Sequence, residues 1–216
     1  MSIPRVIYVM GIDGTGKTTV VEWLAHTLRE QGYEVDVQWL RFNHVLSKPL
    51  LAFCRLVGLT RYEKKHGIRV GYHDFHRVKI VSWLFVLFQY LDALRVKLTR
   101  VLPWLRRERG IVILDRYVYD IIIDLMIDTG IADLDSTWLG RALIGLLPEG
   151  AAVLPLVRER EALLAARPES AVDDNFLRRL QLYEQLVARQ KLPVMENNSS
   201  LDDLLERVSI RVGLSR

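Results

Sequence analysis

Apolar residues along the chain alternate between short strand-like runs and helical stripes. Arg5–Met10 and Ile111–Leu114 are short apolar runs, typical of strands that are covered on both faces. Tyr33–Leu40 alternates apolar and polar residues with period two, which also predicts a strand. From Lys17 to about Gln31 apolar residues recur every fourth position, and Gly32 follows where a glycine commonly ends a helix.

The rest of the chain continues this alternation. The patterns predict strands over Ala151–Val157 and Leu192–Glu196, and helices after Ser47, over Val78–Val101 up to the helix breaker Pro103, over Tyr117–Asp128, Ser136–Leu147 and Asp174–Gln190, and from Ser200 with Asp203 as its capping partner. The polar and aperiodic segment Arg61–Arg77 is predicted to be a surface loop. Five strands separated by helices predict a single α/β domain with a five-stranded parallel sheet and helices on both faces. Ligands of such sheets bind beyond the carboxyl ends of the strands.

Composition narrows the class of protein. The formal net charge is +4 and the pI is about 9.3, which suits a small anionic ligand. The sequence has no zinc-finger spacing, aromatic RNA-binding signature or helix-turn-helix pattern, so no nucleic-acid partner is expected. Cys54 is the single cysteine and no signal peptide is evident, which favours a reducing, cytoplasmic location.

The longest apolar run, Ile80–Leu94, is shorter than the roughly 20 residues of a membrane span. We therefore expect a buried core helix and no membrane span. Docking on a membrane surface stays open, and so does a homodimer, because the helix from Val78 offers an apolar face that can pair with a second copy.

A glycine-rich segment follows the first predicted strand and precedes the first predicted helix. Its residues fit G-x-x-x-x-G-K-[ST] at every fixed position, and the strand and helix provide the context that this phosphate-binding loop requires. Successive backbone amides and the helix N-terminus bind the phosphates, Lys17 reaches the β- and γ-phosphates, and Thr18 places its hydroxyl on Mg²⁺. The expected ATP-phosphate contacts are Gly11, Ile12, Asp13, Gly14, Thr15, Gly16, Lys17, Thr18 and Thr19.

A second motif follows the strand Ile111–Leu114. Asp115 is placed to hold Mg²⁺, as the acid after such a strand does in other proteins with a phosphate-binding loop. The alternative is that Asp115 caps the next helix. Arg116 follows at once, and a cap would not explain an arginine beside a phosphate site.

A third candidate segment is rich in arginine. The segment follows the fourth strand, and Arg158, Arg160 and Arg167 could close over transferring phosphates as catalytic residues. Local pairing of these arginines with nearby glutamates on a solvated surface is the alternative.

These motifs together resemble the thymidylate kinase family of nucleoside monophosphate kinases. "GIDGTGKTT" is similar to that family's phosphate loop, "DRY" to its second motif, and "REREALLAARPES…DDNFLRRLQLYEQL" to its lid and the helix that follows. "LPVMENNSSLDDLLERV" resembles the closing strand and helix that flank the adenine in that family. The resemblance implies a three-layer P-loop kinase fold with a short lid at about 158–174. It also implies phosphoryl transfer from ATP to a nucleoside monophosphate, with Mg²⁺.

The resemblance also implies roles for individual residues. Asp13 would lie near the acceptor's sugar and the phosphates, and Arg116 would bind the acceptor phosphate. Arg41 sits where the family has an arginine after its second strand, and Tyr117 would shape the acceptor pocket. Gly14 occupies a position that is arginine in some members, and members with glycine there tend to carry catalytic arginines in the lid.

Two departures from the family concern the acceptor. Of the run that usually follows the second strand only Arg41 remains, and after "DRY" there is Asp120 near a serine position and no glutamine of the kind that helps to hold thymidylate. A buried carboxylate there is expected to pair with an arginine or to face the base or sugar. The expected reaction is dTMP to dTDP with other monophosphates also accepted. The alternatives are a related kinase acting on another small acceptor, a non-catalytic nucleotide-binding regulator and a nucleic-acid-dependent NTPase.

Overall fold

The computed structural model describes residues 3–41, 44–65 and 68–214. A five-stranded sheet with the order β2-β5-β1-β6-β7 forms its centre, and every neighbouring pair is parallel. The predicted α/β fold with a five-stranded parallel sheet is therefore confirmed. The strands are β1 (Val6–Gly11), β2 (Glu34–Trp39), β5 (Gly110–Asp115), β6 (Ala152–Val157) and β7 (Met195–Glu196).

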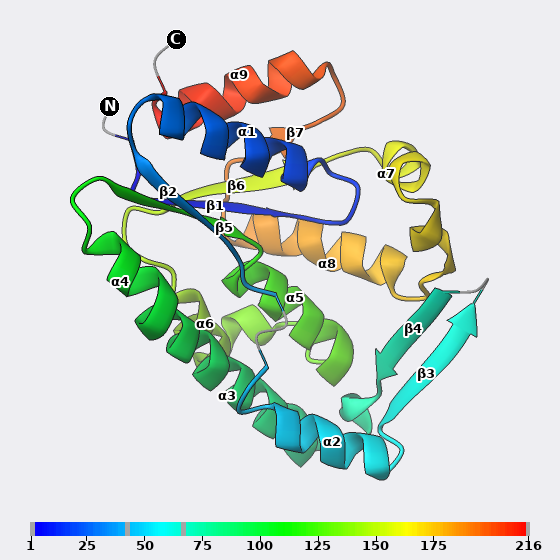
Figure 1. The fold of residues 1–216 in the computed structure, drawn as a ribbon. Helices are drawn as coiled ribbons and strands as arrows, with labels where there is room; N and C mark the ends of the chain where they lie inside the picture. Colours follow the sequence, from blue (N-terminus) through cyan, green and yellow to red (C-terminus); the bar gives the residue numbers. More distant parts are fainter. Residues whose placement is uncertain (1–2, 42–43, 66–67, 215–216) are drawn as a thin grey trace.

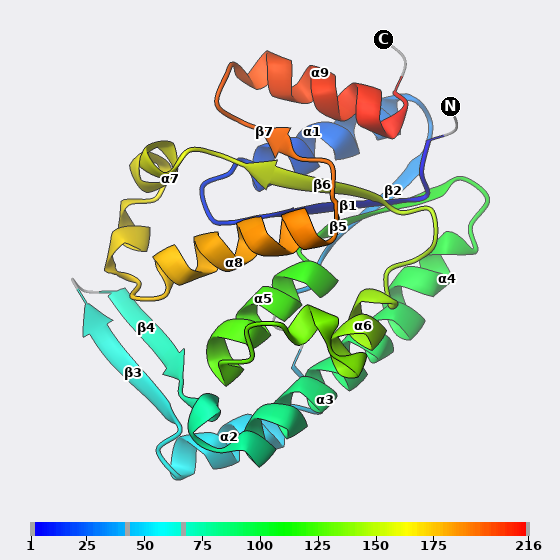
Figure 2. The same ribbon diagram turned by 180° about the vertical axis from the view of Figure 1, so that it is seen from behind.

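Helices cover both faces of this sheet (Figure 1). On one face lie α1 (Lys17–Glu30) and α9 (Leu201–Val212), which enclose a core with the side chains of Ile7, Val9, Ile113 and Leu154. The opposite face is covered by a thicker layer, seen from behind in Figure 2. Its helices are α3 (Lys79–Val96), α4 (Leu102–Leu105), α5 (Val118–Thr129), α6 (Trp138–Ile144) and α8 (Phe176–Arg189).

The remaining elements are short. They are α2 (Lys48–Leu56), α7 (Arg160–Ala166), the antiparallel strands β3 (Thr60–Lys65) and β4 (Ile68–His73), the 3₁₀ turns Phe75–Arg77, Leu134–Ser136 and Pro168–Val172, and the π-helical segment Lys97–Val101.

The register of the central strands decides where a ligand can bind. β1 pairs with β5 on one side and with β6 on the other, so the three strands run in the same direction. Their carboxyl ends, at Gly11, Asp115 and Val157, meet at one edge of the sheet. The glycine-rich loop, the Asp115-Arg116 pair and the arginine-rich segment all leave the sheet at this edge.

Pro155 lies inside β6 without breaking it. The Val157 carbonyl accepts a hydrogen bond from the Asn197 amide at 2.8 Å, so Val157 and, two residues earlier, Pro155 direct their backbone groups toward β7. Pairing with β7 begins only at Leu156. The missing amide of Pro155 therefore faces a stretch where no strand accepts a hydrogen bond.

The helical rod does not end at Pro103 as the sequence predicted. α3 passes into the π-helical segment Lys97–Val101 and then into α4, which has Pro103 in its first turn. A π-helical turn widens the backbone, and a proline in the first turn of the following helix needs no amide donor. The rod ends instead near Arg106, where the chain turns into β5.

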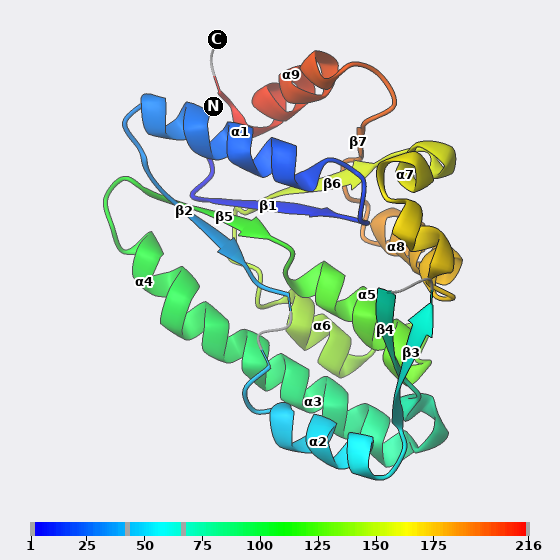
Figure 3. The ribbon, with the colours of Figure 1, turned by 45° about the vertical axis from the view of Figure 1, so that its right-hand side comes forward.

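The segment predicted as a surface loop contains a β-hairpin. β3 and β4 pair in antiparallel register from Thr60 opposite His73 to Lys65 opposite Ile68. The hairpin stands apart from the main sheet and reaches the start of α8, where the Tyr72 hydroxyl accepts a hydrogen bond from the Asp174 amide at 3.4 Å (Figure 3). The prediction of a loop was wrong, because frequent charged residues in this part of the sequence obscure the apolar–polar alternation that predicts a strand.

Two predicted elements are shorter than expected. α6 begins at Trp138, after Thr137 accepts a hydrogen bond from the Gly140 amide at 3.1 Å, and not at Ser136. β7 has only two residues, because the chain from Lys191 still closes the end of α8 through the Leu192 amide and the Val187 carbonyl.

α3 is buried on one face only, so the prediction of a buried core helix was half right. Phe85, Val86 and Val96 pack into the core, whereas Ile80 and Trp83 are exposed. Within residues 3–41, 44–65 and 68–214, no helix has the length and hydropathy that crossing a bilayer requires.

Candidate functional site

The glycine-rich loop adopts a conformation that side chains at two of its positions would disturb. Gly14 and Gly16 have φ values of 92° and 94°, in the region that favours glycine. A Cβ at Gly14 would lie 3.1 Å from the Leu163 carbonyl oxygen of α7, and one at Gly16 would lie 2.8 Å from Asn197 Nδ2. A side chain at Gly14 would therefore be strained by its φ and would press on the backbone of α7.

Lys17 begins α1 and folds back over the loop. Its Nζ donates a hydrogen bond to the Ile12 carbonyl at 2.7 Å and lies 3.9 Å from Asp13 Oδ1. Thr15 Oγ1 donates to the same carbonyl at 2.8 Å. Burial, together with the charge of Arg116, lowers the pKa of Lys17 to about 8. An incoming anion would therefore meet an ammonium group whose hydration is already lost.

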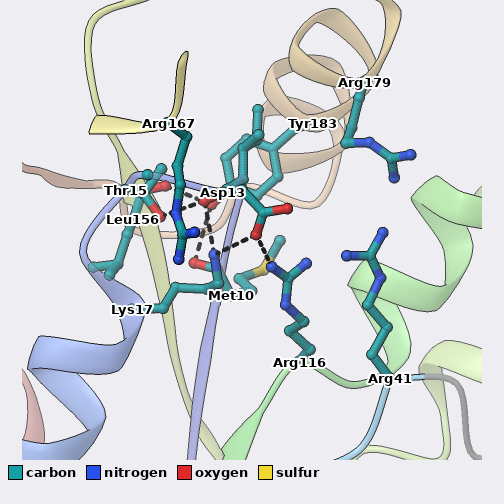
Figure 4. Close-up of polar contacts among 12 residues, drawn as sticks. Met10, Asp13, Thr15, Lys17, Arg41, Arg116, Leu156, Arg167, Arg179 and Tyr183 are labelled. Carbon is teal, nitrogen blue, oxygen red and sulfur yellow. Dashed lines mark hydrogen bonds and ion pairs between the residues drawn. The ribbon is translucent and has the colours of Figure 1, made fainter. Parts of the chain in front are cut away.

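Asp115 and Arg116 face the loop from the end of β5. Asp115 Oδ1 is buried and has no hydrogen-bond partner among the described residues, and burial raises the pKa of this carboxyl. Arg116 has a φ of 63° and forms an ion pair with Asp13 (Figure 4). A non-glycine residue with this φ is uncommon, and such residues cluster at functional sites.

The alternative role for Asp115 as a helix cap is wrong. The first residue before α5 is Tyr117, and Asp120 supplies the capping box through its Oδ2, which accepts the Tyr117 amide at 3.2 Å. Asp115 is therefore left free to bind a ligand at the edge of the sheet.

These residues line a cavity of about 370 Å³. The glycine-rich loop forms its floor, and Trp39 at the end of β2 forms part of its wall. The lining residues are Asp13, Gly14, Gly16, Lys17, Thr18, Thr19, Trp39, Asp115, Arg116, Arg158, Ala166 and Arg167.

The arginine-rich segment lies over this cavity, but its three arginines are not equivalent. Arg158 Nη1 donates to the Gly14 carbonyl at 3.1 Å, and its buried Nε has no partner among the described residues. Arg167 lines the cavity, on the same side as Lys17 and Asp13 (Figure 4). Its Nη1 also pairs with Glu169 at 3.1 Å on the surface. Arg160 is exposed at the start of α7 and does not line the cavity.

Two asparagines after β7 contact the glycine-rich loop and the start of the arginine-rich segment. Asn197 Nδ2 donates to the Thr15 carbonyl at 2.9 Å, and Asn198 Oδ1 accepts the Glu159 amide at 2.9 Å. The chain after β7 thus contacts both segments that surround the first cavity.

A second cavity of about 350 Å³ lies between α5, α3 and the β-hairpin. Arg41, which follows the carboxyl end of β2, and Arg179, in the first turn of α8, both line it. Asp124 of α5 binds both guanidinium groups. Arg41 Nε and Nη2 lie 2.8 and 2.9 Å from the two Asp124 oxygens. The other lining residues are His44, Leu51, Arg55, Thr60, Tyr62, Gly71, His73, Phe85, Gln89, Ile121, Leu125 and Asp128.

A small recess of about 10 Å³ lies between the two cavities. It shares Arg116 with the first cavity, and Asp124 and Arg179 with the second. The two cavities therefore adjoin each other across Arg116.

Two predicted acceptor residues occupy buried positions. The Tyr117 side chain is fully buried, donates to the Ala93 carbonyl at 3.3 Å, and lines neither cavity. Asp120 was expected to pair with an arginine or to face the base or sugar; it lines the recess, and its Oδ2 accepts a hydrogen bond from the Tyr8 hydroxyl at 2.6 Å. This hydrogen bond joins α5 to β1, and burial raises the pKa of the Asp120 carboxyl.

The sequence patterns did not predict most residues of the second cavity. Asp120, Asp124 and Asp128 recur every fourth position on α5, a signal that was available, whereas Arg179, His44 and the hairpin residues come from distant segments.

The segment directly before α2 is held in place by a contact that the sequence did not predict. Asp92 of α3 is 2% exposed and accepts hydrogen bonds from the amides of Val45, Leu46 and Ser47. This carboxylate fixes the segment that carries His44 into the second cavity.

The sequence matches no family model and no curated protein. Among solved structures, the chain is similar to a thymidylate kinase from Ehrlichia chaffeensis, with a TM-score of 0.55 and 15% sequence identity. The match covers 98% of this chain and 100% of that protein. The likeness supports the P-loop kinase fold over nearly the whole length.

Proposed function

We propose that the protein is a kinase that transfers the γ-phosphoryl group of ATP to a nucleoside monophosphate, with dTMP as the first candidate acceptor. The observation that carries the proposal is the pair of adjoining cavities, one around the glycine-rich loop and one lined by Arg41, Asp124 and Arg179. A nucleotide hydrolase or a switch needs only the first cavity. A transferase needs a second substrate in line with the first.

In this proposal the first cavity binds the polyphosphate of ATP. The amides of the loop and the N-terminus of α1 bind phosphate oxygens, and Lys17 offsets charge on the β- and γ-phosphates. Arg158 and Arg167 approach the same cavity from the lid side and would stabilise charge that develops during transfer.

The residues present fit a magnesium ion. Thr18 lines the cavity, and the buried Asp115 Oδ1 without a partner is the kind of oxygen that a divalent cation or its water would satisfy. Magnesium, when bound, would offset negative charge on the phosphates. Thr18 and Asp115 would hold it in place.

Arg116 is proposed to bind the acceptor phosphate, because it borders both the first cavity and the recess. Arg41 and Arg179 would orient the same acceptor in the second cavity. Asp13, which pairs with Arg116, would lie near the acceptor's sugar.

The acceptor itself is the finer part of the proposal. The resemblance to thymidylate kinases in motifs and fold supports dTMP, and the acids of the second cavity favour a broader or altered acceptor range. Asp124 and Asp128 would bind hydroxyl or amino groups, which supports a small polyhydroxylated acceptor as the second candidate.

A coupled assay of ADP formation tests both candidates. Purified protein with ATP and Mg²⁺ is offered dTMP, dUMP, UMP, CMP, AMP and GMP, and then a set of small alcohols and sugars, with Lys17→Ala as the control for contaminating kinases. We expect the highest kcat/KM with dTMP and measurable activity with another monophosphate. Activity with alcohols alone would replace the acceptor. ATP binding without acceptor-dependent ADP formation would refute phosphoryl transfer.

A further inference from the structure

α3 and α6 form an apolar groove on the outside of the molecule, away from both cavities. The groove has a volume of about 320 Å³ and is lined by Ile80, Trp83, Leu84, Leu87, Trp138 and Leu139, with no charged or polar residue among them. Ile80 is 68% exposed and Trp138 is 67% exposed. Contiguous exposed apolar residues of this kind often mark interaction sites, whereas single apolar residues scattered over the surface do not.

The apolar surface continues beyond the groove along the helix. Ile80, Leu84, Leu87 and Leu91 recur at spacings of three or four residues and so share one side of α3, over about 16 Å of helix. The opposite side of α3 is buried in the core. The outward side is therefore an apolar stripe, with Ile80 and Leu84 exposed and Leu87 and Leu91 half-buried.

Positive charges border this stripe. Arg77, Lys79, Arg95 and Lys97 lie on or beside it. In residues 75–107 the only acid is Asp92, which is 2% exposed and occupied by the backbone amides before α2.

The charge asymmetry extends to the whole chain. Residues 41–109 contain 15 lysines and arginines and four acids, a formal charge of +11, whereas the complete chain carries +4. The rest of the protein is therefore net negative by −7, and the basic charge is concentrated in the segment that carries α3.

We propose that the outward face of α3, with Trp138 of α6, docks on the surface of an anionic lipid bilayer. An apolar stripe with lysines and arginines at its edges is the pattern of helices that lie in the interface plane. The apolar side chains would enter the boundary of the acyl chains, and the basic side chains would reach the anionic headgroups. Trp83 and Trp138 have the amphipathic rings that favour this depth.

The same charges disfavour pairing of α3 with a second copy. An antiparallel pair would bring Lys79 of one copy near Lys97 of the other, and a parallel pair would bring like residues together. The face offers no exposed acid to offset this repulsion within residues 75–107. An anionic surface offsets it directly.

Co-sedimentation with vesicles tests the proposal. The full chain is mixed with vesicles of phosphatidylcholine alone, or with roughly a third of phosphatidylglycerol, at about 0.05 M and about 0.5 M salt. We expect binding to the anionic vesicles that weakens at high salt, and little binding to neutral ones. Quenching of tryptophan fluorescence by brominated lipids gives a second measurement that needs no variant.

Matched variants locate the surface. The double variant Ile80→Gln, Trp138→Ser should lower the vesicle partition coefficient by about tenfold or more. Ile210→Gln on α9 is the control, because Ile210 is 69% exposed, like Ile80, but lies on the opposite side of the sheet. Lys79→Gln and Lys97→Gln should each cost about fivefold, and Arg211→Gln should cost little.

Three results would overturn the proposal. The first is no binding to anionic vesicles at low salt. The second is equal binding by the double variant and the Ile210→Gln control. The third is a dimer, measured by light scattering, that the double variant converts to a monomer, since that result would assign the face to self-association.

Discussion

Asp124 and Asp128 lie one helical turn apart on α5, and their surroundings shift their pKa values in opposite directions. Although burial would raise it, the pKa of Asp124 is lowered by Arg179 and Arg41. Burial, and then the charge of Asp124, raise the pKa of Asp128 well above its usual range. At the scale of residues, position relative to the two arginines thus decides which carboxyl carries the charge.

This difference predicts opposite effects on stability. Asp124→Asn should lower the free energy of unfolding at pH 7 by about 3 kcal/mol, because it leaves two partly buried guanidinium groups without their partner. Asp128→Asn should be neutral or slightly stabilising, because the ionised form of this carboxyl is disfavoured in the folded protein. Urea denaturation of the two variants measures both values, and equal losses would contradict the assigned charges.

The pH dependence of the Asp124 effect follows from its lowered pKa. Its contribution is present above the pKa of an unfolded aspartate and is lost as pH falls through the lower folded value. The difference in stability between wild type and Asp124→Asn should therefore shrink in strong acid.

Lys17 leads to a prediction about proton uptake. In the free protein its pKa is about 8, lowered by burial and by Arg116, so the ammonium is lost as pH rises through that value. A bound polyphosphate favours the charged form. ATP binding should therefore take up protons near pH 8–9, and its affinity should fall at higher pH. Calorimetry in buffers of different ionisation enthalpy measures the uptake, and Lys17→Met should abolish it.

At the scale of elements, α7 and the residues before it contact the glycine-rich loop. Gly14 lies close to the Leu163 carbonyl of α7, and Arg158, two residues before α7, donates a hydrogen bond to the Gly14 carbonyl. The arginines of the arginine-rich segment differ in their position relative to the first cavity. Arg158 lines the cavity and has a buried Nε without a hydrogen-bond partner among the described residues, whereas Arg160 is exposed outside the cavity.

Alanine substitution of these two arginines should therefore separate their roles. Arg158→Ala should lower kcat by about 100-fold with a small change in the KM for ATP, because in the proposed reaction its guanidinium would stabilise charge that develops during transfer. Arg160→Ala is the matched control and should keep kcat within about twofold. Steady-state kinetics measures both, and a larger loss in Arg160→Ala would reverse the assignment.

The β-hairpin forms one wall of the second cavity through alternate residues, including Thr60 and Tyr62 of β3. Tyr62→Ala should raise the KM for the acceptor by about tenfold and leave the KM for ATP unchanged, because one stacked aromatic contact is worth about this much. Glu63→Ala is the control, since successive residues of a strand face opposite sides. An effect on ATP alone would place the acceptor elsewhere.

At the scale of the whole molecule, one core joins the sheet to the layer that contains the second cavity. Tyr8, Met10 and Leu114 of the sheet pack in the same cluster as Phe85 of α3 and Tyr183 of α8. We therefore expect residues 1–216 to unfold as a single cooperative domain. Far-ultraviolet circular dichroism and tryptophan fluorescence should give coincident urea transitions, and two separate transitions would divide the chain.

Local sequence patterns were enough to predict the fold class and the loop residues that surround the first cavity. The glycine-rich loop, Lys17 and Asp115 are contributed by segments that each follow a buried strand, and parallel strands bring their carboxyl ends to one edge of a sheet. A local pattern is enough in such cases, because the strand direction fixes the position of whatever follows it.

Contacts between distant elements set the residues of the second cavity, the different positions of Arg158, Arg160 and Arg167, and the environment of Asp120. Arg41, Asp124 and Arg179 meet from the end of β2, from α5 and from α8, and no local pattern encodes that meeting. Tyr8 of β1 is a hydrogen-bond partner of Asp120, because the side of β1 that carries Tyr8 faces α5. Packing between distant elements sets these contacts, and a single sequence carries no signal for which distant residues will touch.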